Sequence, residues 1–229
     1  MMKTVLLIAM FAFSSASANV WTTVYRADGI RPLETTDPCK PFTYTGIMEG
    51  TRLVIVVSSD TSGVWSGDLA IEGESLQHGI LRARDCNEST VGYECSCLEA
   101  VTQDARVYDW VEPGIAGFGL QGHRNAVSGD WFILDYIALA PGICRVAFYD
   151  RAISWDVPIY ELTFQQVPTR DFDRNGTVDF ADFTIMAIYW QETGIEEPSV
   201  CQYSDINRDR AVDIGDMRLF ADYWLYTTQ

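Results

Sequence analysis

Two copies of one acidic pattern, shifted by 34 residues, constrain the C-terminal part of this chain more than any other sequence feature does. The segment DFDRNGTVDFADFTIMAIYW aligns with DINRDRAVDIGDMRLFADYW, so that Asp171 matches Asp205 and Asp182 matches Asp216. Each copy opens with a 12-residue loop that carries side-chain oxygens at positions 1, 3, 5, 9 and 12. Such internal similarity indicates one structural unit that occurs twice.

The oxygen spacing of both loops fits a calcium ion, which takes about six to eight oxygens from loop positions 1, 3, 5, 7, 9 and 12. Position 7 offers only its backbone carbonyl, and position 8, Val178 or Val212, is expected to point into the core. We therefore expect two calcium ions, although a solvated acidic turn is the simpler alternative. The expected ligands are Asp171, Asp173, Asn175, Thr177, Asp179 and Asp182 in the first loop, and Asp205, Asn207, Asp209, Ala211, Asp213 and Asp216 in the second.

A helix is expected to follow each loop, because apolar residues recur there at the spacing of one helical face. These residues are Phe183, Met186, Ala187 and Trp190 in the first copy, and Met217, Phe220, Ala221 and Trp224 in the second. Two half-buried helices can then face each other. Bound metal would stabilise so small a unit, and calcium removal is expected to unfold it while the preceding domain stays folded.

The segment from Thr169 to about Leu225 resembles a type I dockerin, the duplicated calcium-loop-and-helix module that binds cohesin domains. As in that family, Asp rather than Glu closes each loop, and no helix is expected ahead of the first loop. The sequence departs from the family at Arg210, where the sixth loop position should be Gly. A left-handed backbone there costs a non-glycine residue on the order of 1 kcal/mol. The second site should therefore be the weaker one.

The resemblance implies a cohesin partner that contacts loop positions 10 and 11 and the following helix. In this chain these are Phe180, Ala181, Ala187 and Ile188, and in the second copy Ile214, Gly215, Ala221 and Asp222. None of these residues except Asp222 is charged or polar, so a partner with a more apolar surface is implied, and the first copy should dominate. Phe180 and Ile214 could instead be core residues, and the calcium module could serve stability alone.

The region from Asn19 to about Val167 shows the short alternating and aromatic-rich runs, broken by turn residues, that predict an all-β sandwich or barrel. We expect a β-sandwich domain at residues 19–168, similar to cohesin and carbohydrate-binding modules, and a small all-α dockerin-like domain at residues 169–229. Four tryptophans could stack on sugar rings, although core positions are more common for strand tryptophans. They are Trp65, Trp110, Trp131 and Trp155.

Residues 1–18 have the pattern of a secretory signal peptide: one Lys, an apolar run too short to span a bilayer, and an Ala-x-Ala cleavage site. We therefore expect a secreted, extracellular protein without a membrane span. Calcium is plentiful outside cells. The formal charge of −16 argues against nucleic acid or an anionic membrane surface as partner.

Six cysteines in an exported chain predict structural disulfides rather than zinc ligands, because there is no C-x-x-C pair and neither His78 nor His123 has ligand spacing to a cysteine. Six cysteines allow about 15 pairings. Three of them fall in a loop-like insertion at residues 85–98. Cys201 lies between the two predicted helices, and it should either bridge to the β domain or stay free beside one unpaired thiol of that domain.

These observations favour a secreted, non-catalytic binding or assembly protein that docks onto a cohesin in an extracellular, polysaccharide-degrading complex. The alternative is a small glycoside-active enzyme or a carbohydrate-binding module tethered by the dockerin. A glycosidase needs two carboxylates that flank a cleft, and no pair stands out in the β domain. The candidate carboxylates are Asp130, Asp135, Asp150, Asp156 and Glu161.

Overall fold

The computed structural model describes residues 20–27, 30–35, 39–60, 65–83, 105–122, 129–151, 153–154 and 156–228 of the chain. The expected signal peptide and the cysteine-bearing insertion at residues 85–98 lie outside these ranges. Within them, no helix is long and apolar enough to cross a membrane.

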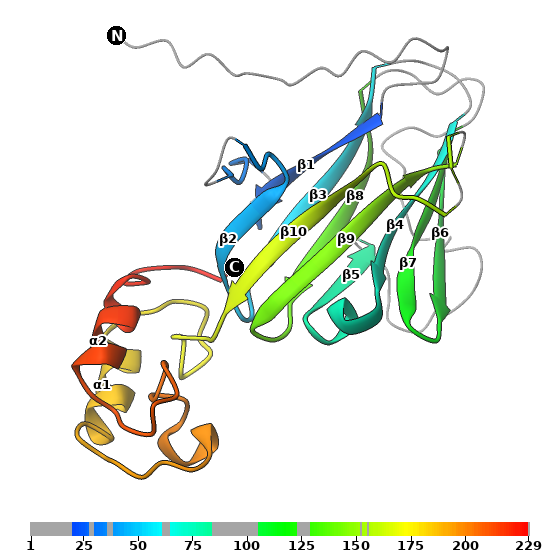
Figure 1. Cartoon of the computed structure of the whole chain (residues 1–229). Coiled ribbons are helices and arrows are strands. Elements are labelled where there is room, and N and C mark those ends of the chain that lie inside the picture. Colours follow the sequence, from blue (N-terminus) through cyan, green and yellow to red (C-terminus); the bar gives the residue numbers. More distant parts are fainter. Residues whose placement is uncertain are drawn as a thin grey trace, which may run out of the picture.

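The N-terminal domain is a sandwich of two β-sheets (Figure 1). The four-stranded sheet has the order β1-β3-β8-β5 and the six-stranded sheet has the order β2-β10-β9-β4-β7-β6. Strand pairs are antiparallel except for β2 and β10, which run parallel. The strands are β1 (Val20–Arg26), β2 (Thr43–Met48), β3 (Arg52–Ser59), β4 (Trp65–Glu72), β5 (Gly79–Ala83), β6 (Ala105–Glu112), β7 (Ile115–Gly122), β8 (Gly129–Ala138), β9 (Gly142–Asp150) and β10 (Tyr160–Val167), with the 3-10 helix η1 (Gly73–Gln77) between β4 and β5.

The core lies between the two sheets, because alternate residues of each strand point to opposite faces. In β3, Leu53, Ile55 and Val57 point inward and are almost completely buried. The rings of Tyr136 from β8 and Phe164 from β10 stack across the core with centroids 4.2 Å apart. Burial of each large apolar side chain stabilises the fold by roughly 1.5–3 kcal/mol. The structure thus confirms the predicted β-sandwich.

The C-terminal domain contains two helices, α1 (Phe180–Ile188) and α2 (Ile214–Ala221), and a 3-10 turn η2 (Pro198–Cys201) between them. Each helix starts with a capping box, in which the loop's ninth and twelfth residues satisfy each other's backbone N–H groups. These pairs are Asp179 with Asp182 and Asp213 with Asp216. The last loop residue therefore belongs to the first helical turn.

The predicted apolar face of each helix is only partly correct. Met186 and Phe220 are buried, but the alanines one position later are exposed, as are Trp190 and Trp224 at 39% and 38%. The helices end before either tryptophan, because the chain soon turns through a left-handed residue, at Gln191 (φ 67°) in the first copy. Both tryptophans consequently lie beyond the helical face that the pattern assumed.

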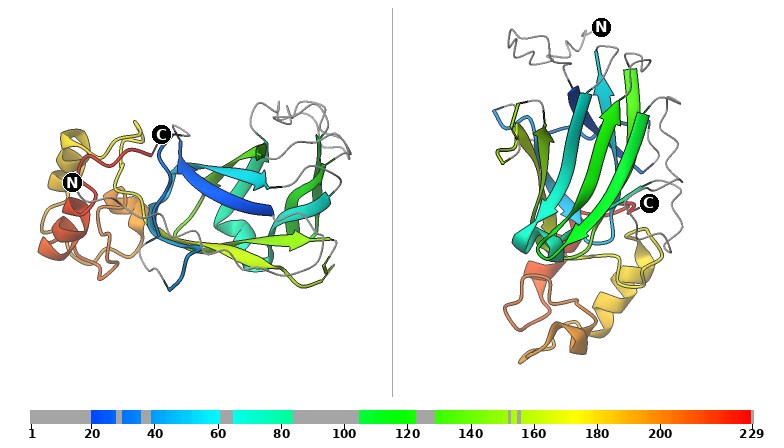
Figure 2. Two further views of the ribbon diagram at one scale, coloured as in Figure 1. Left: turned by 90° about the horizontal axis from the view of Figure 1, so that it is seen from above. Right: turned by 90° about the vertical axis from the view of Figure 1, so that its right-hand side faces the viewer.

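The core of the C-terminal domain includes one residue from the β-sandwich. Its buried members are Met48, Val178, Met186, Ile195, Cys201, Ile206, Val212 and Phe220. Val178 and Val212 are fully buried, as expected for position 8 of each loop. Figures 1 and 2 show the helical domain at one end of the sandwich, next to the turn between β2 and β3.

Two described cysteines are free and buried, Cys144 in the sandwich core and Cys201 in the C-terminal core. The expected disulfide therefore forms at neither residue. Cys201 thus does not bridge to the sandwich, and Cys86, Cys95 and Cys97 lie outside the described residues. Burial raises the pKa of the Cys144 thiol to about 11, so it stays protonated at neutral pH.

Candidate metal centre

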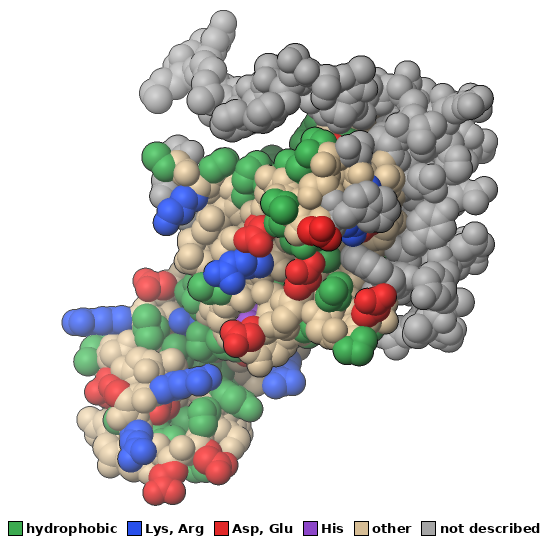
Figure 3. Space-filling view, turned by 45° about the vertical axis from the view of Figure 1, so that its right-hand side comes forward, with side chains coloured by type: hydrophobic (Ala, Val, Ile, Leu, Met, Phe, Trp, Pro, Cys, Tyr) green, Lys and Arg blue, Asp and Glu red, His purple; other side chains and the backbone are tan. Residues whose placement is uncertain are grey.

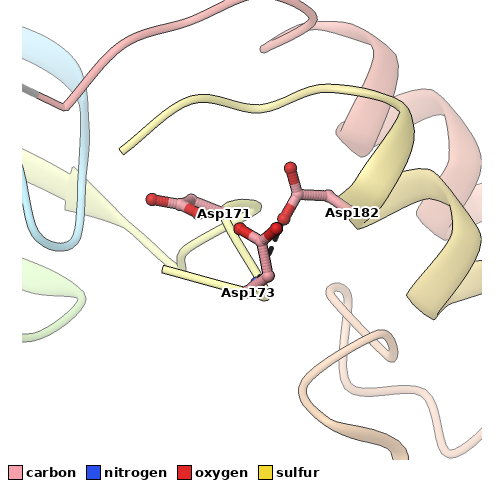
Figure 4. Close-up of side chains that lie close together, drawn as sticks. All are labelled: Asp171, Asp173 and Asp182. Carbon is pink, nitrogen blue, oxygen red and sulfur yellow. Dashed lines mark hydrogen bonds between the residues drawn. The ribbon is translucent and has the colours of Figure 1, made fainter. Parts of the chain in front are cut away.

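The first loop brings three carboxylates together at the start of α1. Oxygens of Asp171, Asp173 and Asp182 all lie within 4.8 Å of one another (Figure 4). Asp171 and Asp182 are buried and Asp173 is exposed, so the cluster is open on one side. Hard oxygen ligands in this number and spacing suit a calcium ion.

Backbone N–H groups fix the orientation of the two buried carboxylates. Asp182 Oδ1 accepts hydrogen bonds from the N–H groups of Phe172 (2.6 Å) and Asp173 (3.2 Å). Asp171 accepts from Asn175 N at 3.0 Å and from Gly176 N at 2.9 Å. The loop is therefore wrapped around its own carboxylates, and its shape does not depend on one contact.

The carboxylate cluster is electrostatically unfavourable without a cation. Burial, followed by the charges of Asp182 and Asp173, raises the pKa of Asp171 above its usual range, while the Gly176 N–H bond opposes this shift. Two unit charges 4 to 5 Å apart repel by roughly 3–4 kcal/mol where the effective dielectric constant is about 20. A bound divalent cation would reverse this repulsion, so the residues present fit such an ion.

The second loop repeats the hydrogen bonds of the first. Asp216 Oδ1 accepts from the N–H groups of Ile206 (2.7 Å) and Asn207 (3.1 Å), as Asp182 does in the first loop. Arg210 N donates to Asp205 Oδ2 at 3.0 Å, and Gly176 N makes the equivalent bond to Asp171. The two loops thus share these backbone hydrogen bonds although their sequences differ.

Asp205 provides a separate reason to expect a cation at the second loop. The residue is 6% exposed, and its Oδ1 atom is buried without a hydrogen-bond donor among the described residues. A buried charged oxygen without a partner is strongly destabilising. The oxygen belongs to the first loop position, which is expected to contact calcium directly. The second loop therefore also fits a bound cation.

Left-handed backbone occurs at two positions of each loop. Arg210 has φ 76° and Gly176 has φ 94°, as expected for position 6. The same conformation occurs at position 4, where it was not expected: Arg174 and Arg208 have φ values of 58° and 60°. The recurrence of Arg at this position in both copies was the available signal. Non-glycine residues in this conformation are strained.

The residues expected to face a partner lie on the surface. Phe180, Ile188 and Ile214 are 72%, 70% and 58% exposed, so Phe180 and Ile214 are not core residues. Ala181, Ala187, Ala221 and Asp222 are also exposed, and Gly215 is half-buried. Figure 3 shows hydrophobic side chains interspersed with acidic and basic ones on this domain.

A shallow apolar groove runs between the two helices, and of its residues only Phe180 and Ala221 were predicted to face a partner. The ring of Phe180 packs edge-on against Trp224, with centroids 4.9 Å apart. The groove is lined by Phe180, Phe183, Met217, Phe220, Ala221 and Trp224. The exposed apolar surface therefore involves both copies of the repeat.

The candidate sites of the β domain are not brought together in the same way. Asp130 and Asp135 lie on β8 of the four-stranded sheet, whereas Glu161 lies on β10 of the other sheet, 3.9 Å from Arg145. Asp150 ends β9, and Asp156 lies in the loop after it. The candidate carboxylates thus occupy both sheets. The side chains of Trp65, Trp110, Trp131 and Trp155 lie outside the described residues.

The C-terminal segment of the chain matches a known domain family. Residues 169–225 match the model of the dockerin type I domain. No curated protein matches the chain.

Similar solved structures include several cohesin modules. One is the cohesin module of a family 33 glycoside hydrolase from Clostridium perfringens ATCC13124, with 10% identity, 67% of this chain and 100% of that chain covered, and a TM-score of 0.35. A type II cohesin-X-dockerin complex from Acetivibrio cellulolyticus shows 11% identity, with coverage of 52% and 87% and a TM-score of 0.34. A non-cellulosomal cohesin from Archaeoglobus fulgidus shows 16% identity, with coverage of 66% and 93% and a TM-score of 0.31. Residues 169–225 are therefore a dockerin type I domain, and a β-sandwich precedes it in the chain.

Proposed function

We propose that this protein is a secreted, non-catalytic assembly protein whose dockerin domain binds two calcium ions and docks onto a cohesin module of another extracellular protein. The observation that carries the proposal is the duplicated carboxylate cage. Both loops orient an aspartate at positions 1 and 12 with the same backbone N–H groups. A solvated acidic turn would not require this agreement.

Calcium would be held by six residues of each loop. Side-chain oxygens at positions 1, 3, 5 and 12 supply most of the ligands, position 7 supplies its carbonyl, and position 9 contacts the ion directly or through water. Position 12 also caps the following helix. Ion binding would therefore fix the start of α1 and α2, and with it the position of the exposed face.

The exposed apolar residues then meet the partner. Phe180 and Ile188 lie on α1, separated by about two turns, so both can contact one flat surface. Asp222 replaces Ile188 at the equivalent place of the second copy. Because a charge is costly to bury in an apolar interface, the first copy is the better docking face.

Binding to a panel of purified cohesin modules, measured with and without calcium, tests the proposal. We expect binding to at least one cohesin in calcium and none after chelation, with two calcium ions bound per chain by calorimetry. Substitution of Asp171 and Asp205 by Ala should abolish both signals. Calcium uptake without binding to any cohesin would favour a purely stabilising role, and an absence of calcium uptake would contradict the proposal entirely.

A further inference from the structure

The dockerin domain of this chain is packed against its own β-sandwich, and the contacts converge on the first calcium loop. We propose that the turn between β2 and β3 is an intramolecular docking surface for the dockerin, coupled to calcium binding at the first loop. The inference rests on calcium binding by the proposed function, but it does not require a cohesin partner. The β-sandwich would then be an internal partner of the dockerin. It does not cover the exposed face around Phe180.

Met48 is the centre of this surface. It is fully buried, and it belongs to the core of the dockerin although it ends strand β2 of the sandwich. Its neighbour Ile47 points into the sandwich core. The parallel pairing of β2 with β10 sets Met48 opposite Val167, the last residue of β10. The chain therefore passes from β10 into the dockerin next to Met48, the residue that the dockerin covers.

Arg170 connects this surface to the first calcium loop. It precedes Asp171, the first loop residue, and it is only 3% exposed. Its backbone N–H points at the Met48 sulfur at 3.2 Å, and its guanidinium lies 4.5 Å from the ring centroid of Tyr223. Tyr223 in turn donates a hydrogen bond from its hydroxyl to the Gly46 carbonyl at 3.2 Å. The start of the loop is thus fixed by the sandwich.

The C-terminal tail forms a second connection. Thr228 N donates to the carbonyl of Gly176 in the first loop at 3.0 Å, while the Thr228 carbonyl accepts from Arg52 N of the sandwich at 2.9 Å. The tail also pairs with Val178 through two backbone bonds, from Val178 N to Tyr226 (2.9 Å) and from Leu225 N to Val178 (2.8 Å). One short segment therefore bridges the calcium loop and strand β3.

Charge supports the same docking. Burial raises the pKa of Glu49, which lies in this turn, while Arg174, the Thr169 backbone N–H and Arg208 act in the opposite direction and favour its charged form. Glu49, Thr169 and Arg174 line the same cavity beside the turn. The two arginines occupy position 4 of the two loops. One carboxylate of the sandwich is thus attracted by a positive charge from each half of the repeat. This gives a structural reason for a basic residue at position 4 in otherwise acidic loops.

The second loop does not share the tail connection. The segment 191–195 is the counterpart of the tail, and its backbone bonds go to Val212, Tyr189 and Arg210. Among the described residues, none of its hydrogen bonds reaches the sandwich. The two loops are therefore equivalent inside the dockerin but differ in their contact with the β domain.

Calcium binding and docking are expected to be coupled through these contacts of the first loop. If calcium orders the first loop, it also orders Arg170 and the tail, which favours docking; by linkage, docking must favour calcium by the same factor. Coupling free energies between sites usually correspond to roughly 5- to 150-fold changes in affinity. We expect the lower part of this range, because the docking contacts are few.

Calorimetric calcium titration of the full chain tests the coupling. In an Asp205→Asn background, which leaves the first loop to titrate, Glu49→Lys and Met48→Ala should each weaken calcium binding by about fivefold or more. Glu112→Lys is the matched control, since it makes the same charge change at the exposed last residue of β6. It should leave the affinity unchanged.

Tyrosine substitutions give a milder pair of variants that retain the fold. Tyr223→Phe removes the hydroxyl that reaches Gly46 and should weaken calcium binding measurably. Tyr189→Phe makes the same change at the equivalent position of the first copy, where the side chain packs in the dockerin core, and it should have no effect.

Hydrogen exchange provides a readout inside the sandwich. Calcium should slow exchange of the Arg52 amide, which donates to the tail, but not that of Ile71 in the centre of the six-stranded sheet. Calcium binding with unchanged Arg52 exchange, together with unchanged affinity in Glu49→Lys and Met48→Ala, would overturn the inference and leave the proposed function intact. An absence of calcium binding would overturn both.

Discussion

Replacement of Arg210 by glycine should stabilise the calcium-loaded dockerin. Arg210 holds the sixth position of the second loop at φ 76°, and its N–H bonds to Asp205. A left-handed backbone costs a non-glycine residue roughly 1–2 kcal/mol. The greater freedom of glycine in the unfolded chain offsets roughly 0.5–1 kcal/mol of that gain. With the middle of both ranges, the free energy of unfolding should therefore rise by about 0.5–1 kcal/mol.

Thermal unfolding in saturating calcium measures this change. A gain of 1 kcal/mol shifts Tm by roughly 4–8 °C for a small domain, so Arg210→Gly should raise the dockerin transition by roughly 2–8 °C. Gly176→Arg makes the reverse exchange in the first loop, where φ is 94°, and should lower the same transition. A decrease in Tm for Arg210→Gly, or no change for Gly176→Arg, would refute the assumption that strain at this position decides the difference between the loops.

The other predictions concern the exposed face and the two buried thiols. Replacing both Phe180 and Ile188 by Ser should weaken cohesin binding, since each anchor buries apolar surface worth roughly 1.5–3 kcal/mol, while calcium affinity is retained; Ile214→Ser should weaken binding less. Surface plasmon resonance against one cohesin compares them, and equal losses would contradict a dominant first copy. Chelation of calcium should expose Cys201 to a thiol-alkylating reagent, because it lies in the dockerin core, while Cys144 in the sandwich core stays protected. Mass spectrometry after alkylation distinguishes them, and alkylation of both cysteines would mean that the domains unfold together.

The dockerin loops could be predicted because their information is local. All six expected ligands of a loop lie within twelve residues, and the same spacing recurs 34 residues later. The caps at Asp179 and Asp213 follow from the same short segments. The special character of position 4, held by Arg in both loops, was not predicted, because an arginine in an acidic loop has no role within that loop. Its role depends on Glu49, more than a hundred residues earlier in the chain.

The sandwich could be predicted as a class but not in its strand order. Alternation in single strands predicts which residues point inward, as Leu53, Ile55 and Val57 do. It does not determine which strands pair, and the parallel pairing of β2 with β10 joins segments more than a hundred residues apart. That pairing decides where the dockerin is attached, because it brings the end of β10 next to the turn after β2.

The sequence contains one local sign of a second covered surface at this turn, which was not used for a prediction. Successive residues of a strand point to opposite faces, so two adjacent large apolar residues at the end of a strand cannot share one core. Ile47 and Met48 form such a pair, and both are almost completely buried. Ile47 belongs to the sandwich core and Met48 to the dockerin core. The pair indicates that another part of a protein covers the outer face of β2, but only the fold identifies this part as the chain's own dockerin. Because the dockerin covers Met48, calcium binding at the first loop and docking on the sandwich are expected to influence each other.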